Sequence, residues 1–445
     1  MSDTSAALAL IGCGFHAKRI YVKYLSDRSV QPKLIVDVFS NRESIMQVRR
    51  DNGWSDTKVY FVDPKDSYDS FSVINKAQIM RLFTNLQISK AIISTPPEVH
   101  MPYAKLCLEA GVKVLVDKPL SAPRNISSGN SSELLDDIMS LLRYDVGNNI
   151  VVQCQRRRHD GYRYVKSLIR EIGEKYGLQP HFIDIYHSDG RWDFPDEIVT
   201  LKNHPYVTGY GKLLHSGYHF VDLLAFLTED VSYDGFELFS YKHGINDFKA
   251  QVPDRFYKEA FGIENKHSFA DHGHGEIDSY SLVQLKNGGR VRTTANISLL
   301  HSGFTRRSWG VAKADLYKGN GRLRHERVNI QIGPLMNIQV HSYQSTEVGD
   351  SQRAKPGDFG GLEHFDIHIF RNAEMIGGEP YELVTLKSLE ESTAPGLGQN
   401  ENARYQLIDD FLANRASNSA IRSHIRTNIL LASIAESMHK NQQVS

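Results

Sequence analysis

The chain has 445 residues, of which 40% are hydrophobic and 23% charged, a composition typical of a globular protein and unlike a disordered or disulfide-rich chain. Lysine plus arginine equals aspartate plus glutamate, 52 against 52, so no net charge favours nucleic acid or an anionic membrane as a partner. The sequence lacks a run of roughly 18 apolar residues and a basic N-terminal region, so we expect a cytoplasmic protein without a membrane span.

The first third of the chain alternates short apolar runs with helical patterns. The helical patterns cover residues 16–28, 41–52, 75–87, 98–110 and 132–142, and polar gaps at 63–72 and 122–132 predict loops. The apolar runs that predict strands read ALALIG, KLIVDVF, KVYFV, KAIIST, VKVLVD and NIVVQCQ. Such strands joined by crossover helices are typical of a parallel sheet covered on both faces. We therefore predict a doubly wound α/β domain over residues 1–150.

The remaining residues, 151–445, contain fewer helices and longer strands. Helical patterns cover 160–176, 216–228 and the segment IRTNILLASIAESMHK. The predicted strands read HFIDIYH, DSYSLVQLKN, RVRTTANISLL, ADLYKG, GRLRHERVNIQIG and MNIQVHSYQ. Turn residues at 287–289 and 318–321 predict antiparallel hairpins. We expect an α+β domain with a large, mostly antiparallel open sheet and a terminal helix, one sheet face being left for a subunit partner.

A glycine-rich turn follows the first predicted strand. Gly12 and Gly14, with Phe15 and His16 between the second glycine and Ala17, form a G-x-G-x-x-A pattern at the start of a helix. Glycines in this context permit a tight turn and the close approach of a pyrophosphate to helix N-terminal amides. The pattern predicts a Rossmann domain that binds a dinucleotide.

The second strand is followed by two alternative sets of ribose contacts. Asp37 has the spacing of a ribose-binding carboxylate, which favours NAD. Ser40 and Glu43 are spaced as a capping box, which starts the helix near residue 41 and leaves Val38 or Phe39 at the strand end. In that register Ser40, Asn41 and Arg42 face the ribose, and Arg42 can accept a 2′-phosphate. We expect NAD and leave NADP open.

A second motif, Asp117-Lys118-Pro119, ends the strand VKVLVD. Together with GCGFHA, with IISTPPEVH and with GYGKLLHSGYHFVDLL, it resembles the Gfo/Idh/MocA family, named for glucose-fructose oxidoreductase and inositol dehydrogenase. The resemblance covers most of the chain. Segments near 180–208, 240–275 and 345–400 exceed the compact core of that family, and we expect substrate choice to depend on them.

The resemblance implies NAD(P)-linked oxidation or reduction of a carbon on a sugar, cyclitol or related ring. It implies that Lys118 lies near the reacting oxygen and the nicotinamide. It further implies that one loop, containing Thr95, Pro96, Glu98 and His100, lines the cofactor, and that the C-terminal sheet joins the subunits of a homodimer or homotetramer.

The helical segment after residue 211 contains the second group of candidate catalytic residues. Helical spacing places His215 and His219 on one face, with Asp222 three residues beyond His219. The resemblance implies that His219 is the acid/base residue, and a histidine has a pKa suited to that role at neutral pH. The family usually has aspartate where this chain has His215, so a catalytically altered dinucleotide-binding regulator is the alternative function. The same residues offer three metal ligands, but we expect no metal because the HExxH glutamate and a cysteine partner are lacking.

Further polar residues are candidates for substrate contacts. Arg157 follows the strand that joins the two predicted domains, and we include it with Lys118, His215 and His219 as a substrate-binding residue. The segment HSDGRWDFP, with Asp189, Arg191 and Trp192, offers hydrogen bonding and stacking to a sugar, and a loop containing His272 and His274 is a further candidate. The combined prediction is an NAD(P)-dependent dehydrogenase or reductase acting on CH–OH.

Overall fold

A computed structural model describes most of the chain, which forms two compact units. The described residues are 7–64, 71–123, 126, 131–145, 147–191, 205–261, 274–304, 323–345, 364–389 and 399–442. The first unit comprises residues 1–123, 132–158 and 400–428, and the second comprises 124–131, 159–399 and 429–445. The domain boundary expected at residue 150 stays a prediction.

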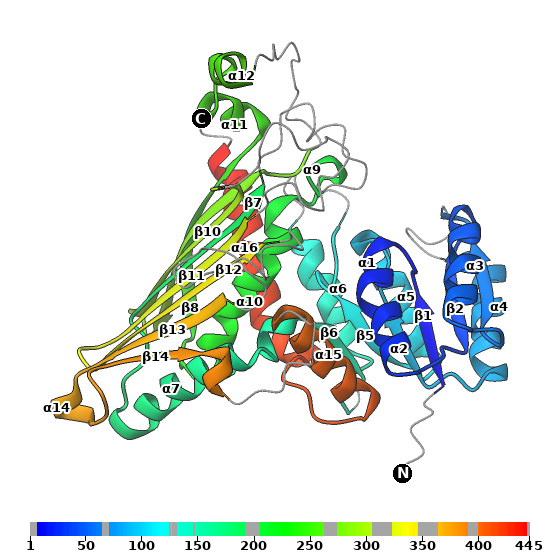
Figure 1. Cartoon of the computed structure of the whole chain (residues 1–445), viewed down its shortest axis with the longest axis horizontal. Helices are drawn as coiled ribbons and strands as arrows, with labels where there is room; N and C mark the ends of the chain where they lie inside the picture. Colours follow the sequence, from blue (N-terminus) through cyan, green and yellow to red (C-terminus); the bar gives the residue numbers. More distant parts are fainter. Residues whose placement is uncertain are drawn as a thin grey trace. The chain divides into compact units, whose positions relative to one another are not determined.

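The first unit is built on a six-stranded parallel sheet (Figure 1). Its strands are β1 (Leu8–Ile11), β2 (Leu34–Val38), β3 (Lys58–Val62), β4 (Lys90–Ile93), β5 (Lys113–Asp117) and β6 (Ile150–Gln153). They lie in the order β3-β2-β1-β4-β5-β6, so the strand order reverses between β1 and β4. Ligands of doubly wound sheets bind at the carboxyl ends of the strands at such a reversal. All six strands agree with the predicted runs, and the doubly wound fold is confirmed.

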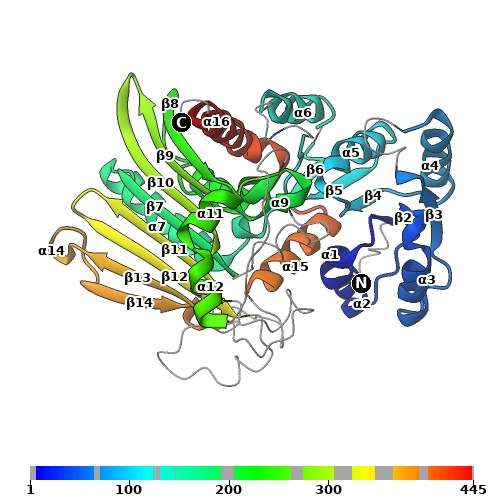
Figure 2. The same cartoon turned by 90° about the horizontal axis from the view of Figure 1, so that it is seen from above.

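Helices cover both faces of this sheet. Figure 2 shows α1 (Phe15–Ala17), α2 (Lys23–Asp27) and α3 (Arg42–Asp51) on one face and α4 (Val73–Asn85), α5 (His100–Glu109) and α6 (Ser132–Leu142) on the other. A π-helical turn, Lys18–Val22, joins α1 to α2. The strand β2 ends at Val38, as the alternative register predicted, but the capping box is wrong. The N-cap of α3 is Asn41, no side chain caps it, and Ser40 is exposed.

A segment from the end of the chain belongs to the first unit. Helix α15 (Gln399–Leu412) was not predicted, and its residues Ala403, Leu407, Ile408 and Phe411 are buried. Beyond it, Ala420 forms an antiparallel bridge with Val151 of β6. The sheet edge at β6 is thereby covered by residues about 270 positions away in the sequence, a distance that only tertiary packing can bridge.

The second unit contains an eight-stranded sheet in the order β14-β13-β12-β11-β7-β10-β9-β8 (Figure 1). Its strands are β7 (Phe182–Arg191), β8 (Gly235–His243), β9 (Asp278–Asn287), β10 (Arg290–Ser302), β11 (Leu323–Ile332), β12 (Met336–Ser345), β13 (His364–Arg371) and β14 (Tyr381–Thr385). Among the described strands β7 and β10 pair in parallel and the other neighbours are antiparallel. The predicted mostly antiparallel sheet is confirmed, including the β9–β10 hairpin at Gly288 and Gly289. β8, β13 and β14 were not predicted, and the turn predicted at 318–321 lies outside the described residues.

The two faces of this sheet differ in chemistry because side chains alternate along each strand. The inner face is buried and aliphatic, as in the cross-strand row Ala295, Ile183, Ile330 and Ile338. Figures 1 and 2 show α7 (Asp160–Tyr176), α10 (Tyr218–Leu227) and the later part of α16 (Ile425–Gln442) on this face. No described helix covers the opposite face, which we call the outer face.

Four short helices are also found among the described residues of the second unit. They are α9 (Pro205–Thr208), α11 (Ile245–Gln251), α12 (Asp254–Phe261) and α14 (Ala373–Ile376). A search of the described helices finds none that is long and apolar enough to cross a membrane.

Candidate functional site

The glycine-rich turn lies between β1 and α1, where the strand order of the first unit reverses. Gly12 has a φ of +83°, and a Cβ there would lie 2.6 Å from the carbonyl oxygen of Ser94, so only glycine fits. A Cβ on Gly14 would meet nothing within 4 Å, which leaves the backbone open on that side. Phe15 is exposed, while Ala17 is fully buried against the sheet. The turn therefore packs closely against the backbone of Ser94 at Gly12, and at Gly14 it leaves space for a phosphate.

Asp37 lies one residue before the end of β2 and is buried. Its Oδ2 accepts a hydrogen bond from the backbone N–H of Cys13 at 2.6 Å, and its Oδ1 accepts from the N–H of Val38 and from Asn41 Nδ2. The carboxylate therefore holds the glycine-rich turn against the end of β2. The guanidinium of exposed Arg42 lies 5.7 Å from the ring centre of Phe39, which is also exposed.

Asp117 and Lys118 lie at the carboxyl end of β5. Asp117 accepts hydrogen bonds from the Tyr21 hydroxyl and from Ser94 Oγ, and His16 Nε2 lies 3.7 Å from Asp117 Oδ2. Burial lowers the pKa of the Lys118 ammonium to about 8, and repulsion from Arg404 acts in the same direction. Lys118 can therefore exchange a proton near neutral pH, which an ordinary lysine does not do.

The loop after β4 contains the residues expected to line the cofactor. Thr95 and Glu98 are partly buried, Pro96 is exposed, and the Thr95 hydroxyl is buried without a hydrogen-bond partner among the described residues. His100, the first residue of α5, is only 1% exposed. Its Nδ1 lies 2.8 Å from the carbonyl oxygen of Pro119 and its Nε2 lies 3.0 Å from that of Thr95. His100 thus contacts two backbone segments of the first unit.

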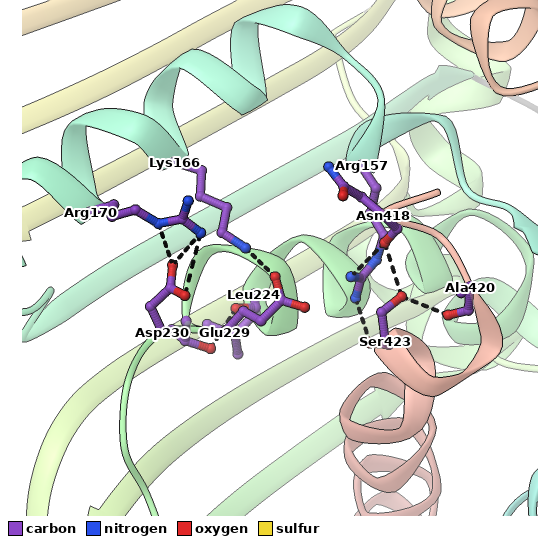
Figure 3. A network of polar contacts seen from close by, with 10 residues as sticks. Arg157, Lys166, Arg170, Leu224, Glu229, Asp230, Asn418, Ala420 and Ser423 are labelled. Atoms are coloured by element: carbon purple, nitrogen blue, oxygen red, sulfur yellow. Dashed lines mark hydrogen bonds and ion pairs between the residues drawn. The ribbon is translucent and has the colours of Figure 1, made fainter. Parts of the chain in front are cut away.

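Arg157, expected to bind substrate, is almost fully buried in the first unit. Its guanidinium donates to the carbonyl oxygens of Asn418 and Ser423 at 3.3 and 2.9 Å (Figure 3). Figure 3 also shows two ion pairs of the second unit, which tie Lys166 to Glu229 and Arg170 to Asp230. These contacts suit a structural role for Arg157, and its substrate role stays a prediction.

The histidine segment lies in the second unit. A π-helical turn, Leu213–Gly217, leads into α10. His219 and Asp222 are buried, whereas His215 is exposed, with its ring centre 6.3 Å from that of Tyr210. The α-helical spacing assumed for residues 215 and 219 does not apply across a π turn, since such a turn contains an extra residue. His219 rather than His215 is the residue held in a defined buried position.

A buried charged cluster beside this segment was only partly foreseen. Lys212 Nζ lies 2.5 Å from Asp189 Oδ2, His187 Nε2 lies 3.2 Å from Asp189 Oδ1, and these three residues are at most 5% exposed. The ring of His187 stacks on Phe220 of α10 at 4.3 Å. Asp189 was a candidate from the sequence, but Lys212 was missed although it lies within the motif GYGKLLHSGYH. The position of Lys212 between a glycine and two leucines could have indicated a buried lysine, because a lysine in an apolar environment needs an acidic partner.

A second buried acid fixes the start of the same segment. Glu276 Oε1 accepts the backbone N–H of Leu213 at 2.6 Å, and burial raises the pKa of its carboxyl. Gly211 has a φ of +59°, and a Cβ there would lie 2.1 Å from the Glu276 carboxylate. Asp189 and Glu276 together determine where the segment containing His219 begins.

The remaining sequence candidates are Arg191, Trp192, His272 and His274, of which Arg191 is the last residue of β7. Trp192 and His272 lie outside the described residues. His274 stacks on Tyr206 with ring centres 4.8 Å apart. A search of the described residues finds no group of three or more His, Cys, Asp or Glu side chains that could hold a metal ion.

Comparisons with known proteins agree with this architecture. Residues 7–133 match the model of an oxidoreductase family with an NAD-binding Rossmann fold, Gfo/Idh/MocA. An uncharacterized oxidoreductase of Escherichia coli, YdgJ, is 26% identical over 184 residues, which are 41% of this chain and 44% of that protein.

Solved structures resemble the whole chain in fold. An oxidoreductase domain protein from Kribbella flavida has a TM-score of 0.61 at 13% identity, covering 98% of this chain and 97% of the other. The aldose-aldose oxidoreductase of Caulobacter crescentus has a TM-score of 0.58 at 13% identity, with the same coverage. A levoglucosan dehydrogenase, solved with NADH and levoglucosan, has a TM-score of 0.58 at 14% identity, covering 97% of each chain.

Proposed function

Because residues 7–133 match the model of the Gfo/Idh/MocA oxidoreductase family, we propose that the protein is an NAD(P)-dependent dehydrogenase or reductase that acts on a CH–OH carbon of a sugar- or cyclitol-like substrate. The observation that carries the proposal is the position of Lys118 directly after β5, at the carboxyl edge of the sheet, where burial lowers the pKa of its ammonium to about 8. The substrates named for the structural relatives, aldoses and levoglucosan, support the carbohydrate class.

The first unit has features that fit a dinucleotide. The backbone at Gly14 is open, the N-terminus of α1 follows directly, and the buried Thr95 hydroxyl lacks a partner among the described residues. We propose that Gly12, Gly14, Phe15 and His16 hold the pyrophosphate. We propose that Thr95, Pro96 and Glu98 line the nicotinamide end. A bound nicotinamide would supply or accept the hydride.

We propose NAD rather than NADP as the cofactor. The carboxylate of Asp37 is held at the end of β2 by three donors, which fixes an anion near the predicted ribose site. An anion there accepts hydrogen bonds from ribose hydroxyls and repels a 2′-phosphate. Exposed Ser40 and Arg42 are the groups that favour NADP instead. Asp37→Ala should therefore weaken NADH binding and reduce the preference for NADH over NADPH.

We propose separate roles for Lys118 and His219 in the reaction. In the oxidation direction, the Lys118 amine donates a hydrogen bond to the reacting oxygen and stabilises the negative charge that develops there. His219 accepts the hydroxyl proton and returns it in the reduction direction. Lys118 belongs to the first unit and His219 to the second. His215, exposed on the preceding turn, is proposed to contact substrate.

A titration with NADH and NADPH, followed by nicotinamide fluorescence and a screen of sugars and cyclitols by absorbance, tests the proposal. We expect micromolar binding of one nucleotide and turnover of at least one substrate. Lys118→Ala should abolish turnover and leave nucleotide affinity within about threefold. Turnover retained by that variant would contradict the role of Lys118, and nucleotide binding without any turnover would favour the regulator.

We propose that the outer face of the second unit's sheet joins subunits of a homodimer or homotetramer. Phe239 and Leu282, paired across β8 and β9, are 45% and 42% exposed, and Phe370 and Tyr381 are paired and exposed on β13 and β14. These two apolar pairs lie at opposite edges of the sheet, and exposed apolar side chains on one face are typical of an interaction site. Leu282→Glu should yield monomers in light scattering, whereas Met375→Glu, on α14, should not.

A further inference from the structure

Both ring nitrogens of His100 face carbonyl oxygens, and a neutral imidazole can donate a hydrogen bond to only one of them. Its two ring nitrogens face the carbonyl oxygens of Thr95 and Pro119, and a carbonyl oxygen only accepts hydrogen bonds. A neutral imidazole has one N–H and can donate to one of them, whereas an imidazolium donates to both. The His100 side chain is buried, so a ring nitrogen left without a hydrogen bond costs free energy.

The two carbonyl groups belong to the two segments that hold the proposed cofactor and substrate contacts of the first unit. Thr95 begins the loop after β4, and Pro119 directly follows Lys118 at the end of β5. The strands β4 and β5 are neighbours, but their register ends with the pair Ile93 and Val116. Beyond that pair, Ser94 Oγ donates to Asp117 Oδ2 at the strand ends, and the His100 ring bridges the two segments that follow, from Thr95 to Pro119.

We propose that His100 is a positioning residue that holds the Thr95 loop and the Lys118-Pro119 segment at a fixed separation. The inference rests on the proposed function only in assigning those two segments to the active site. The buried His100 ring, through its two carbonyl contacts, helps to set the spacing between the Thr95 hydroxyl and the Lys118 amine.

The charged groups around His100 act in opposite directions. Burial lowers the pKa of the His100 ring and Lys118 lowers it further, while Asp117 and the two carbonyl groups raise it. A glutamine at position 100 donates from one nitrogen atom and should keep one of the two carbonyl contacts. A leucine there cannot donate and should keep neither. His100→Gln and His100→Leu therefore form a graded pair.

A matched control is available in the same unit. His424 is fully buried and contacts Ser419 Oγ at 2.8 Å, on the segment beyond α15. His424→Leu also removes a buried imidazole, but it does not touch either segment that His100 bridges. Loss of fold stability alone should affect both leucine variants in the same way.

The experiment measures Lys118 in the protein without nucleotide. Competitive labelling with acetic anhydride across a pH series, read by mass spectrometry, gives the apparent pKa of the Lys118 amine. We expect about 8 in the wild-type protein, a rise of at least about one unit in His100→Leu, a smaller rise in His100→Gln, and no change in His424→Leu. The rise follows because a released Lys118-Pro119 segment exposes the amine to water.

A parallel NADH titration should show affinity about tenfold weaker in His100→Leu than in His424→Leu, the effect of about 1.4 kcal/mol for a lost buried hydrogen bond. An unchanged Lys118 labelling profile in His100→Leu, or an equal shift in His424→Leu, would overturn the proposal. If His100→Leu does not fold, His100→Gln decides by the same criterion. If no form binds NADH but the labelling shift is seen, the dehydrogenase proposal fails and the positioning role stands.

Discussion

Replacing Lys118 by methionine should stabilise the first unit at neutral pH, although Lys118 is central to the proposed chemistry. Burial lowers the pKa of its ammonium from an ordinary 10.5 to about 8 in the folded protein. One pKa unit corresponds to about 1.4 kcal/mol, so keeping Lys118 protonated and folded costs roughly 3 kcal/mol. Methionine fills nearly the same volume without a charge, so the variant should recover most of this energy.

The sign of the pH dependence follows from proton counting. Below pH 8 the lysine is protonated in both the folded and the unfolded chain, and the cost is constant. Between about pH 8 and 10.5 the unfolded chain binds the extra proton, so the stability contributed by this group rises with pH. The advantage of Lys118→Met should therefore be largest at pH 7 and should vanish by about pH 10.5.

The neighbouring acid does not reverse this result. Asp117 keeps its hydrogen bonds from Tyr21 and Ser94 when Lys118 is removed, so its carboxylate is not left bare. Urea unfolding at pH 7, 8, 9 and 10 measures the difference in the free energy of unfolding from wild type. Lys33→Met, at an exposed position before β2, controls for loss of charge alone. A Lys118→Met protein that is less stable at pH 7, or whose advantage does not decline with pH, would refute the reasoning.

Three further predictions concern stability and binding. Lys212→Met should destabilise the protein by about 3–5 kcal/mol in urea unfolding, because it leaves Asp189 buried without its cation, and adding Asp189→Asn should restore most of the loss. An unimproved double variant would show that the pair is not coupled. Gly12→Ala should lower the melting temperature and abolish NADH binding, since its φ is +83° and a Cβ meets the Ser94 carbonyl oxygen. Gly14→Ala should leave the melting temperature within about 2 °C and weaken NADH binding at least about tenfold, since the Cβ meets only the space left for phosphate; undiminished NADH affinity would place the pyrophosphate elsewhere.

The sequence predicted those strands and helices whose own pattern of apolar residues shows which positions are buried. The strand β1 is buried on both faces, so an unbroken apolar run reports it. Helix α15 has buried Ala403, Leu407, Ile408 and Phe411 at helical spacing, but the polar residues between them conceal that pattern. β8 was missed for a different reason. Its exposed positions, Phe239 and Tyr241, are aromatic, and buried Ser240 lies between them, which inverts the usual alternation.

The candidate site was predicted least well where side chains compete for the same backbone groups. Ser40 has the spacing of an N-cap, yet the carboxylate of Asp37 binds Val38 and Asn41 and the helix begins one residue later. Both Ser40 and Asp37 are visible in the sequence, but the sequence does not show which of the two side chains binds the backbone at the start of the helix. That outcome depends on Cys13, which donates its N–H to Asp37 and draws the carboxylate toward the glycine-rich turn.

The position of His219 depends on charges that no sequence window around it contains. The inner face of β7 continues from Ile183 and Ile185 into His187 and Asp189, so an apolar face becomes charged at the carboxyl end of the strand. A buried carboxylate there is tolerated only with a donor, and Lys212 supplies it. Since Lys212 begins the turn that leads into α10, the ion pair and not apolar packing alone determines where that helix starts. The buried environment of His219 is therefore a consequence of an acid 30 residues earlier in the chain.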